Sequence, residues 1–103
     1  MPMDALQVVA EPRRREILRL VWAEEASASE IAARFDVTFP AVSQHLGVLR
    51  RAGFVSVRRE GTRRFYRADR ERLGDLAVVL QRMWASTLDE LATLAEEAES
   101  TDG

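Results

Sequence analysis

The chain of 103 residues has no cysteine and no lysine, one histidine and three prolines. Without cysteine there is neither a disulfide nor a thiolate metal site. No apolar run approaches the roughly 18 residues that cross a bilayer. The first residues have neither the basic start nor the apolar core of a signal peptide. We therefore expect a cytoplasmic protein that does not enter a membrane. The length of the chain fits one domain, which we place over residues 1–98.

The basic residues are all of one kind and are unevenly spread. All 15 are arginine, a side chain suited to bidentate contacts with phosphate and guanine. A GC-rich genome would favour arginine over lysine, but it would not decide where the arginines lie. Residues 34–67 hold eight arginines and two acidic residues, a net charge of +6, whereas residues 73–103 have a net charge of −6. A basic segment in a chain of net charge −2 indicates a polyanionic partner.

Capping residues mark the starts of three helices in the first part of the chain. Asp4 is expected to cap a helix over residues 4–10, and Pro12 suits the first turn of a second helix. Ser27 and Glu30 form a capping box for a third helix, in which each side chain would satisfy a backbone donor of the other. The apolar spacing predicts that the second and third helices bury Ile17, Leu18, Val21, Ile31, Ala32 and Phe35.

A fourth helix is expected to begin after Thr38 and to end at Gly53. A tight turn at residues 36–37 would join it to the third helix, which is the layout of a helix-turn-helix. Three apolar residues recur at helical spacing and predict one buried stripe: Val42, Leu46 and Leu49. The opposite face of this helix would then be exposed and would carry Phe39, Ser43, Gln44 and Arg50.

An arginine-rich β-ribbon is predicted after the fourth helix. Residues 54–59 and 64–68 form its strands, and the turn at 60–62 has Gly61 where a positive φ is needed. Because side chains alternate across a ribbon, the arginines beside the turn cannot all face one groove. We expect one of Arg63 and Arg64, with one of Arg58 and Arg59, to meet phosphate or the minor groove; a charged edge that prevents aggregation is the other interpretation.

The last predicted helix, over residues 73–98, has an apolar stripe too long for a small winged core to cover. Such a helix indicates a partner helix, most simply its own copy. Residues 99–103 are expected to be a flexible acidic tail. The fold class is thus mainly helical (α+β): a winged helix-turn-helix with a two-stranded β-wing and a long C-terminal dimerisation helix.

Several segments together resemble the ArsR/SmtB family of bacterial winged-helix regulators. They are Pro12–Leu18, Ser29–Ala32, Pro40–Gly53 and the spaced residues Arg58, Gly61, Arg64 and Tyr66. The resemblance implies a homodimer joined by the first and last helices that binds a palindromic operator, usually as a repressor. The stretch of Trp84 and Leu88 resembles the branch that lacks metal ligands. The chain departs from the family pattern at two positions that are commonly polar, which here hold Phe39 and Trp22.

The family pattern and the exposed faces together define the predicted sites. The DNA-binding residues are Thr38, Phe39, Pro40, Ser43, Gln44, His45, Arg50, Arg58, Arg59, Arg63 and Arg64. The dimer-interface residues on helices 4–10 and 73–98 are Leu6, Val9, Leu76, Leu80, Met83, Trp84, Leu88 and Leu91. The predicted partners are double-stranded DNA and a second copy of the chain, with no membrane and no cofactor; a small-molecule effector is left open.

Some residues keep two interpretations. Phe39 could touch a thymine methyl or pack under the turn, and His45 could contact a phosphate or make a structural hydrogen bond. Arg13, Arg14 and Arg15 could brace phosphate; alternatively, Arg14 or Arg15 could form a salt bridge with Glu16 or Glu30. The tryptophans Trp22 and Trp84 fit a core or an interface, or a ligand pocket at the dimer seam.

Other functional classes fit the sequence less well. His45 is the only histidine, and with no cysteine it makes a poor metal site. No paired acid and base flank a nucleophile, and no glycine-rich phosphate loop occurs, so we do not expect an enzyme. A winged helix that binds only proteins is the alternative, but it would not need a charge of +6 on the helix and wing. The sequence therefore predicts a transcriptional regulator that does not respond to metal.

Overall fold

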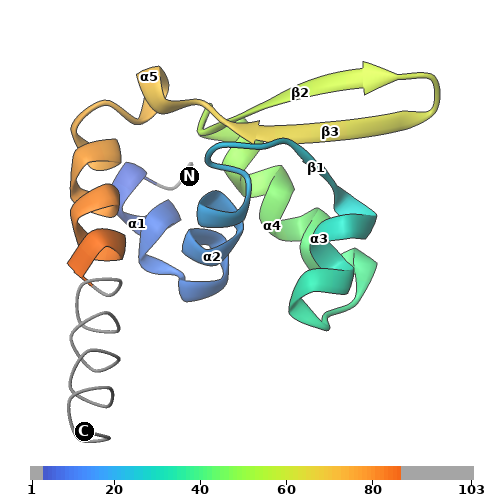
Figure 1. Cartoon of the computed structure of the whole chain (residues 1–103), viewed down its shortest axis with the longest axis horizontal. Helices are drawn as coiled ribbons and strands as arrows, with labels where there is room; N and C mark the ends of the chain where they lie inside the picture. Colours follow the sequence, from blue (N-terminus) through green and yellow to red (C-terminus); the bar gives the residue numbers. More distant parts are fainter. Residues whose placement is uncertain (1–3, 87–103) are drawn as a thin grey trace, which may run out of the picture. The chain divides into compact units, whose positions relative to one another are not determined.

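The computed structural model describes residues 4–86 of the chain (Figure 1). These residues belong to two compact units that divide after Arg72. The elements of the first unit run in the order α1 (Ala5–Ala10), α2 (Pro12–Leu20), β1 (Ala26–Ser27), α3 (Ala28–Phe35), α4 (Phe39–Arg51), β2 (Val55–Glu60) and β3 (Arg63–Ala68). The short helix α5 (Arg70–Leu73) spans the division, and residues 75–86 are helical.

The helix starts agree with the capping residues. Asp4, Ser27 and Thr38 are the N-caps of α1, α3 and α4, as predicted, and Pro12 lies in the first turn of α2. The expected capping box at Ser27 is only half formed. The Glu30 backbone N–H donates to Ser27 Oγ at 3.2 Å, but the Ser27 hydroxyl donates to the Glu30 carboxylate at 3.1 Å. Ser27 belongs to β1, so its backbone takes part in the sheet and not in a reciprocal cap.

The sheet has three antiparallel strands in the order β1-β3-β2, one more than the two-stranded wing predicted. Ala26 and Ser27 of β1 pair with Tyr66 and Phe65 of β3. A strand of two residues has no alternation to recognise, so the sequence did not indicate it. The longer β2–β3 hairpin turns at Gly61, whose φ is 61°, and projects beyond the helices (Figure 1).

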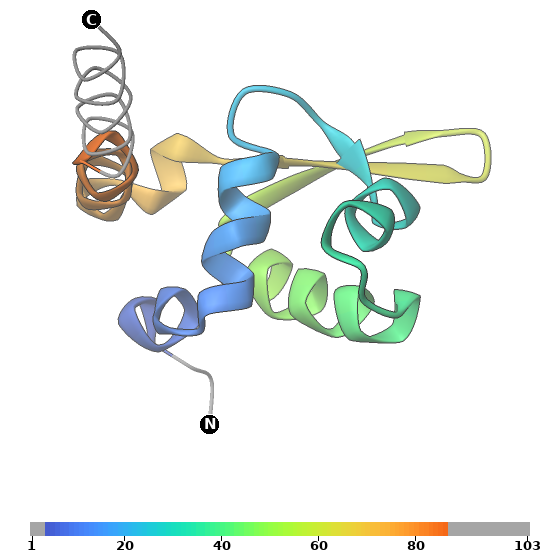
Figure 2. The same cartoon turned by 60° about the horizontal axis from the view of Figure 1, so that its bottom comes forward.

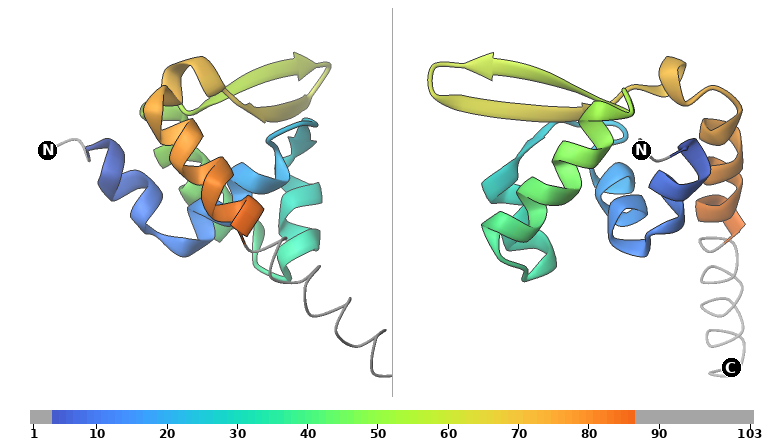
Figure 3. Two further views of the ribbon diagram at one scale, coloured as in Figure 1. Left: turned by 60° about the vertical axis from the view of Figure 1, so that its left-hand side comes forward. Right: turned by 180° about the vertical axis from the view of Figure 1, so that it is seen from behind.

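The core of the first unit lies between α2, α3, α4 and the base of the hairpin. The apolar residues that were expected inside are fully or almost fully buried, namely Ile17, Leu18, Val21, Ile31, Val42, Leu46 and Leu49. Ala32 and Phe35 are half-buried. The end of α4 meets the base of the hairpin (Figure 3), where the Phe54 N–H donates to the Leu49 carbonyl at 2.9 Å. This core fixes α4 against the sheet and leaves its opposite face exposed.

The apolar stripe predicted a C-terminal helix that begins at residue 73. In the structure this helix begins at residue 75. The helix α5 ends at Leu73, Gly74 follows with a φ of 56°, and helix resumes over residues 75–86. A left-handed residue stops one helix and lets the chain start another, which the apolar spacing alone could not reveal. Residues 87–103, which include the predicted end of this helix, Leu88, Leu91 and the acidic tail, lie outside those described. In the described part of the chain, no helix is long and apolar enough to cross a membrane.

Candidate nucleic-acid interface

The helices α3 and α4 form the predicted helix-turn-helix (Figure 2). Asp36 ends α3 in the left-handed conformation, with a φ of 53°, and the Val37 N–H donates to the Ala32 carbonyl at 3.2 Å. Aspartate tolerates this conformation better than most residues, because its short polar side chain can hydrogen-bond locally. Thr38 then starts α4, where its Oγ1 accepts from the Ala41 N–H at 3.3 Å. The turn therefore holds the first residues of α4 at a fixed angle to α3.

The predicted reading face of α4 is open to solvent. Ser43, Gln44 and Arg50 are exposed, opposite the buried stripe of Val42, Leu46 and Leu49. Phe39 is 53% exposed, so it does not pack under the turn. His45 is half-buried, and its Nδ1 is buried with no hydrogen-bond partner within residues 4–86. Thr38 caps α4 through its side chain and Pro40 lies in the first turn, so both residues support the start of the helix.

The register of the hairpin sorts the four wing arginines onto two faces. Arg58 lies opposite Phe65, and Arg59 lies opposite Arg64. Glu60 lies opposite Arg63. Because alternate residues point to opposite sides of a strand, one face carries Arg58, Phe65 and Arg63, and the other carries Arg59 and Arg64.

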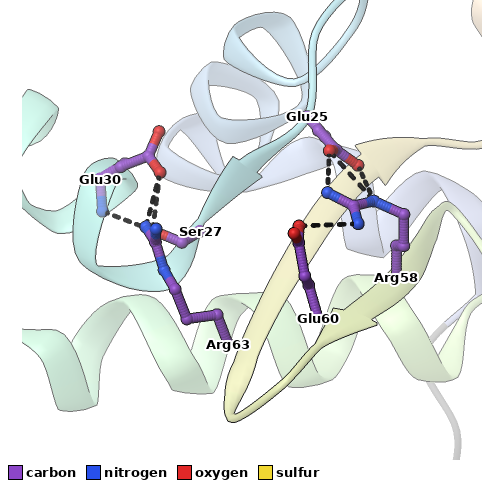
Figure 4. Close-up of polar contacts among 6 residues, drawn as sticks. All are labelled: Glu25, Ser27, Glu30, Arg58, Glu60 and Arg63. Carbon is purple, nitrogen blue, oxygen red and sulfur yellow. Dashed lines mark hydrogen bonds and ion pairs between the residues drawn. The ribbon is translucent and has the colours of Figure 1, made fainter.

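The arginines of the first face form ion pairs with carboxylates of the same protomer (Figure 4). Arg58 Nε donates to both carboxylate oxygens of Glu25, at 3.1 and 3.0 Å, and Arg58 Nη1 lies 3.0 Å from Glu60. Arg63 Nη2 lies 3.2 Å from Glu30. Both guanidinium groups also lie over the Phe65 ring, 4.8 and 4.9 Å from its centroid. These contacts join the wing to α3 and to Glu25, the residue before β1.

The charges at this junction reinforce each other. The hydrogen bonds from Arg58 lower the pKa of the Glu25 carboxyl below its ordinary value, and the charge of Arg67 acts in the same direction. In turn, Glu25 and then Glu60 raise the pKa of Arg58. Both partners are therefore ionised at neutral pH. The sequence could not reveal this pairing, because Glu25 and Arg58 are 33 positions apart.

The arginines of the second face, Arg59 and Arg64, are not used in these ion pairs. Arg59 and Arg64 are exposed and have no ion-pair partner in the described part of the chain. Arg64 lines an open groove between the wing tip and the helix-turn-helix, together with Ser29, Phe39, Ser43, Thr62 and Arg63. The reading face of α4, the start of α3 and the wing tip thus border one concave surface with hydroxyl, aromatic and arginine side chains.

Arg14 and Arg15 do not form the salt bridge to Glu16 or Glu30 that the sequence suggested. Arg14 is buried; its Nε donates to the Val8 carbonyl at 2.7 Å and its Nη2 to the Gln7 carbonyl at 3.2 Å. Arg15 donates to the carbonyls of residues 9 and 10 at 2.9 and 2.8 Å. The last carbonyls of α1 have no partner within their own helix, so these two arginines satisfy them. The salt bridge to Glu16 is made by Arg13, at 2.8 Å.

The residues expected at a dimer interface differ in exposure. Leu6 is 68% exposed and Met83 is 44% exposed, whereas Val9 and Leu80 are buried. Leu76, Trp84 and Trp22 are half-buried. The interface itself stays a prediction.

Comparison with known proteins gives a consistent set of similarities. A family model described as "Bacterial regulatory protein, arsR family" matches residues 11–57. The HTH-type transcriptional regulator Rv2034 of Mycobacterium tuberculosis is 38% identical over 95 residues, which cover 92% of this chain and 89% of that protein. The biofilm growth-associated repressor of Agrobacterium fabrum is 34% identical, over 84% of this chain and 74% of that protein.

A solved structure shares the fold as well as the sequence. It is the solution structure of a homodimeric winged helix-turn-helix DNA-binding domain from Mycobacterium bovis, 31% identical to this chain with a TM-score of 0.62. The match covers 82% of this chain and 74% of that one. The winged helix-turn-helix expected from the sequence is therefore confirmed.

Proposed function

This chain belongs to the ArsR family of bacterial regulatory proteins, and we propose that it is a homodimeric repressor that binds a palindromic operator and does not respond to metal. The family and the names of the relatives indicate a DNA-binding transcriptional regulator and not an enzyme. One observation carries the proposal: the exposed face of α4 and the unpaired wing residue Arg64 border the same groove. We place this regulator in the cytoplasm, where its DNA would be.

The proposed complex follows from the exposed side chains. The helix α4 would lie in the major groove, with its N-terminal residues at the base edges. Gln44 can pair in a bidentate manner with adenine, and Ser43 can donate or accept. Arg59 and Arg64 would meet the flanking phosphates or the minor groove, because no carboxylate of the described residues neutralises them. Arg50, exposed near the end of α4, would add a third positive charge.

A dimer gives this complex its symmetry. Leu6 presents an apolar side chain on α1, and the similar domain from Mycobacterium bovis is described as homodimeric. A two-fold pair would present two reading helices, so half-sites would lie about one helical turn, ~34–36 Å, apart or a multiple of that. Repression would follow if the occupied operator overlaps a promoter, and the Agrobacterium fabrum relative is named as a repressor. The lack of cysteine in the whole chain supports a regulator that is not metal-responsive.

A mobility-shift assay on duplexes from upstream of the chain's own gene tests the proposal. The wild-type dimer should shift one duplex, and Gln44→Ala should weaken that complex by ~1–3 kcal/mol if the contact is bidentate. The matched control is Gln81→Ala, which removes an exposed glutamine from the helical residues 75–86. Normal operator binding by Gln44→Ala would show that α4 reads DNA through other residues. A folded wild-type chain that shifts no duplex at low ionic strength would instead favour a protein-interaction module.

A further inference from the structure

Phe39 is an apolar side chain at the start of a face that is otherwise polar. It is the first residue of α4 and is 53% exposed, and it lines the groove together with Ser43, Thr62 and Arg64. The core does not need it, because Val42, Leu46 and Leu49 fill the buried side of the helix. An aromatic ring among hydroxyl and guanidinium groups is therefore positioned to meet an apolar feature of whatever enters the groove.

The backbone holds this ring in a defined place. Asp36 fixes the turn with its left-handed conformation, and Thr38 caps the helix through the Ala41 N–H. Pro40 restricts φ in the first turn. The direction of the Phe39 Cα–Cβ bond is thus set before any ligand binds. Because the backbone needs no rearrangement, binding costs only the rotamer freedom of the ring, and a small contact area can still discriminate.

The major groove of DNA offers one apolar group to a side chain at this position. It is the C5 methyl of thymine; the other exposed features are hydrogen-bond donors and acceptors. A phenyl ring can satisfy none of these polar groups and would bury them unpaired, which carries a free-energy cost. We propose that Phe39 selects a thymine in each half-site through contact with its C5 methyl group, an inference that rests on the proposed function of the chain.

The expected effect is small per contact and doubled by symmetry. Removing one buried methyl-sized group should weaken binding about fourfold, which corresponds to ~0.8 kcal/mol. Two half-sites that contribute independently would give about fifteenfold for the doubly substituted operator. The effect should depend on the methyl group alone, because deoxyuridine keeps every hydrogen-bonding atom of thymidine.

A uracil-interference experiment tests this contact at every thymine of the operator at once. The operator duplex recovered from the upstream region is prepared with thymidine replaced at random by deoxyuridine, and bound and free fractions are cleaved at uracil. Wild-type protein should show one symmetric pair of thymines at which uracil reduces binding, and Phe39→Ala should lose that signal while keeping any others. Duplexes with uracil at this pair should then lose about fifteenfold affinity for wild type and almost none for Phe39→Ala.

A second variant separates the contact from the fold. Phe39→Leu keeps an apolar side chain at the same place and should retain the uracil signal. Because Phe39 is exposed, we expect both variants to stay folded. Identical uracil patterns for wild type and Phe39→Ala, or no uracil signal in a specific wild-type complex, would overturn the contact and leave the proposed regulator intact. Failure of the wild-type dimer to shift any upstream duplex is a separate result, and it would remove both.

Discussion

Replacing Arg64 by alanine should make operator binding less sensitive to salt, whereas the same change at Arg58 should leave the salt dependence almost unaltered. The difference follows from the two faces of the wing. Arg58 is neutralised by Glu25 and Glu60 inside the protomer, and Arg64 has no ion-pair partner among residues 4–86. An arginine that is already paired must first break that pair before it can replace a counterion at a phosphate.

The magnitude follows from the number of phosphates contacted. If each protomer neutralises about four phosphates, the dimer contacts about eight, and log affinity falls with log salt at a slope of about −7. Arg64→Ala removes one contact per protomer and should reduce the steepness by about 1.8, from a slope of about −7.2 to about −5.4. Arg58→Ala removes no phosphate contact, so its slope should stay near −7.

Fluorescence anisotropy with a labelled operator duplex can measure these slopes between about 50 and 200 mM salt, a range in which such complexes lose several orders of magnitude in affinity. The same titration on an unrelated duplex shows whether Arg64→Ala weakens all sequences alike, as expected for a backbone contact. Urea denaturation of each variant confirms that the fold is kept.

Two results would refute this reasoning. If Arg58→Ala makes the salt dependence as shallow as Arg64→Ala does, the ion pair between Arg58 and Glu25 opens when DNA binds. The proposed division of the wing arginines into paired and DNA-binding residues would then be wrong. If both variants keep the wild-type slope, Arg64 does not contact a phosphate, and its lack of an ion-pair partner does not indicate a DNA contact.

Two further predictions concern the arginines that the protomer uses internally. Arg14→Met should lower the free energy of unfolding by ~1.5–3 kcal/mol, because the last carbonyls of α1 lose charge-assisted hydrogen bonds. Urea denaturation at one fixed protein concentration measures this change. The control is Arg13→Met, which removes an exposed ion pair and should lower the free energy of unfolding by under about 1 kcal/mol. Glu25 has a folded-state pKa below the ordinary 4.5, so the stability from its pair with Arg58 should be present at neutral pH and be lost as the pH falls through the lowered pKa. A carboxyl chemical-shift titration should show that pKa rising in Arg58→Ala, and an unchanged pKa would contradict the pairing.

The helix-turn-helix could be predicted from the sequence because its signals are local. Asp4, Ser27 and Thr38 satisfy donors within three residues of themselves, and the stripe of Val42, Leu46 and Leu49 needs only the helical period. Once one stripe is buried, the opposite face of the same helix must be exposed. The reading face of α4 followed for this reason, although its contacts with DNA stay a prediction.

Features that depend on distant residues were missed or left open. The two residues of β1 form a strand only because β3 lies beside them, and two residues show no period. Arg14 and Arg15 appeared to be DNA or salt-bridge residues because a sequence does not show which carbonyls lack partners. Gly74 interrupts the last helix through its backbone conformation, which the apolar stripe around it conceals.

The sequence by itself determined the winged helix-turn-helix, the basic segment at residues 34–67 and the exposed face of one helix, since caps, periods and local charge act over a few residues. Only the tertiary structure decided how the four wing arginines are used. Their roles depend on strand register and on the carboxylates of Glu25 and Glu30, each 33 positions away from its arginine. Such pairings arise when the chain folds back on itself. The protomer therefore pairs Arg58 and Arg63 with its own carboxylates, whereas Arg59 and Arg64 have no ion-pair partner among residues 4–86.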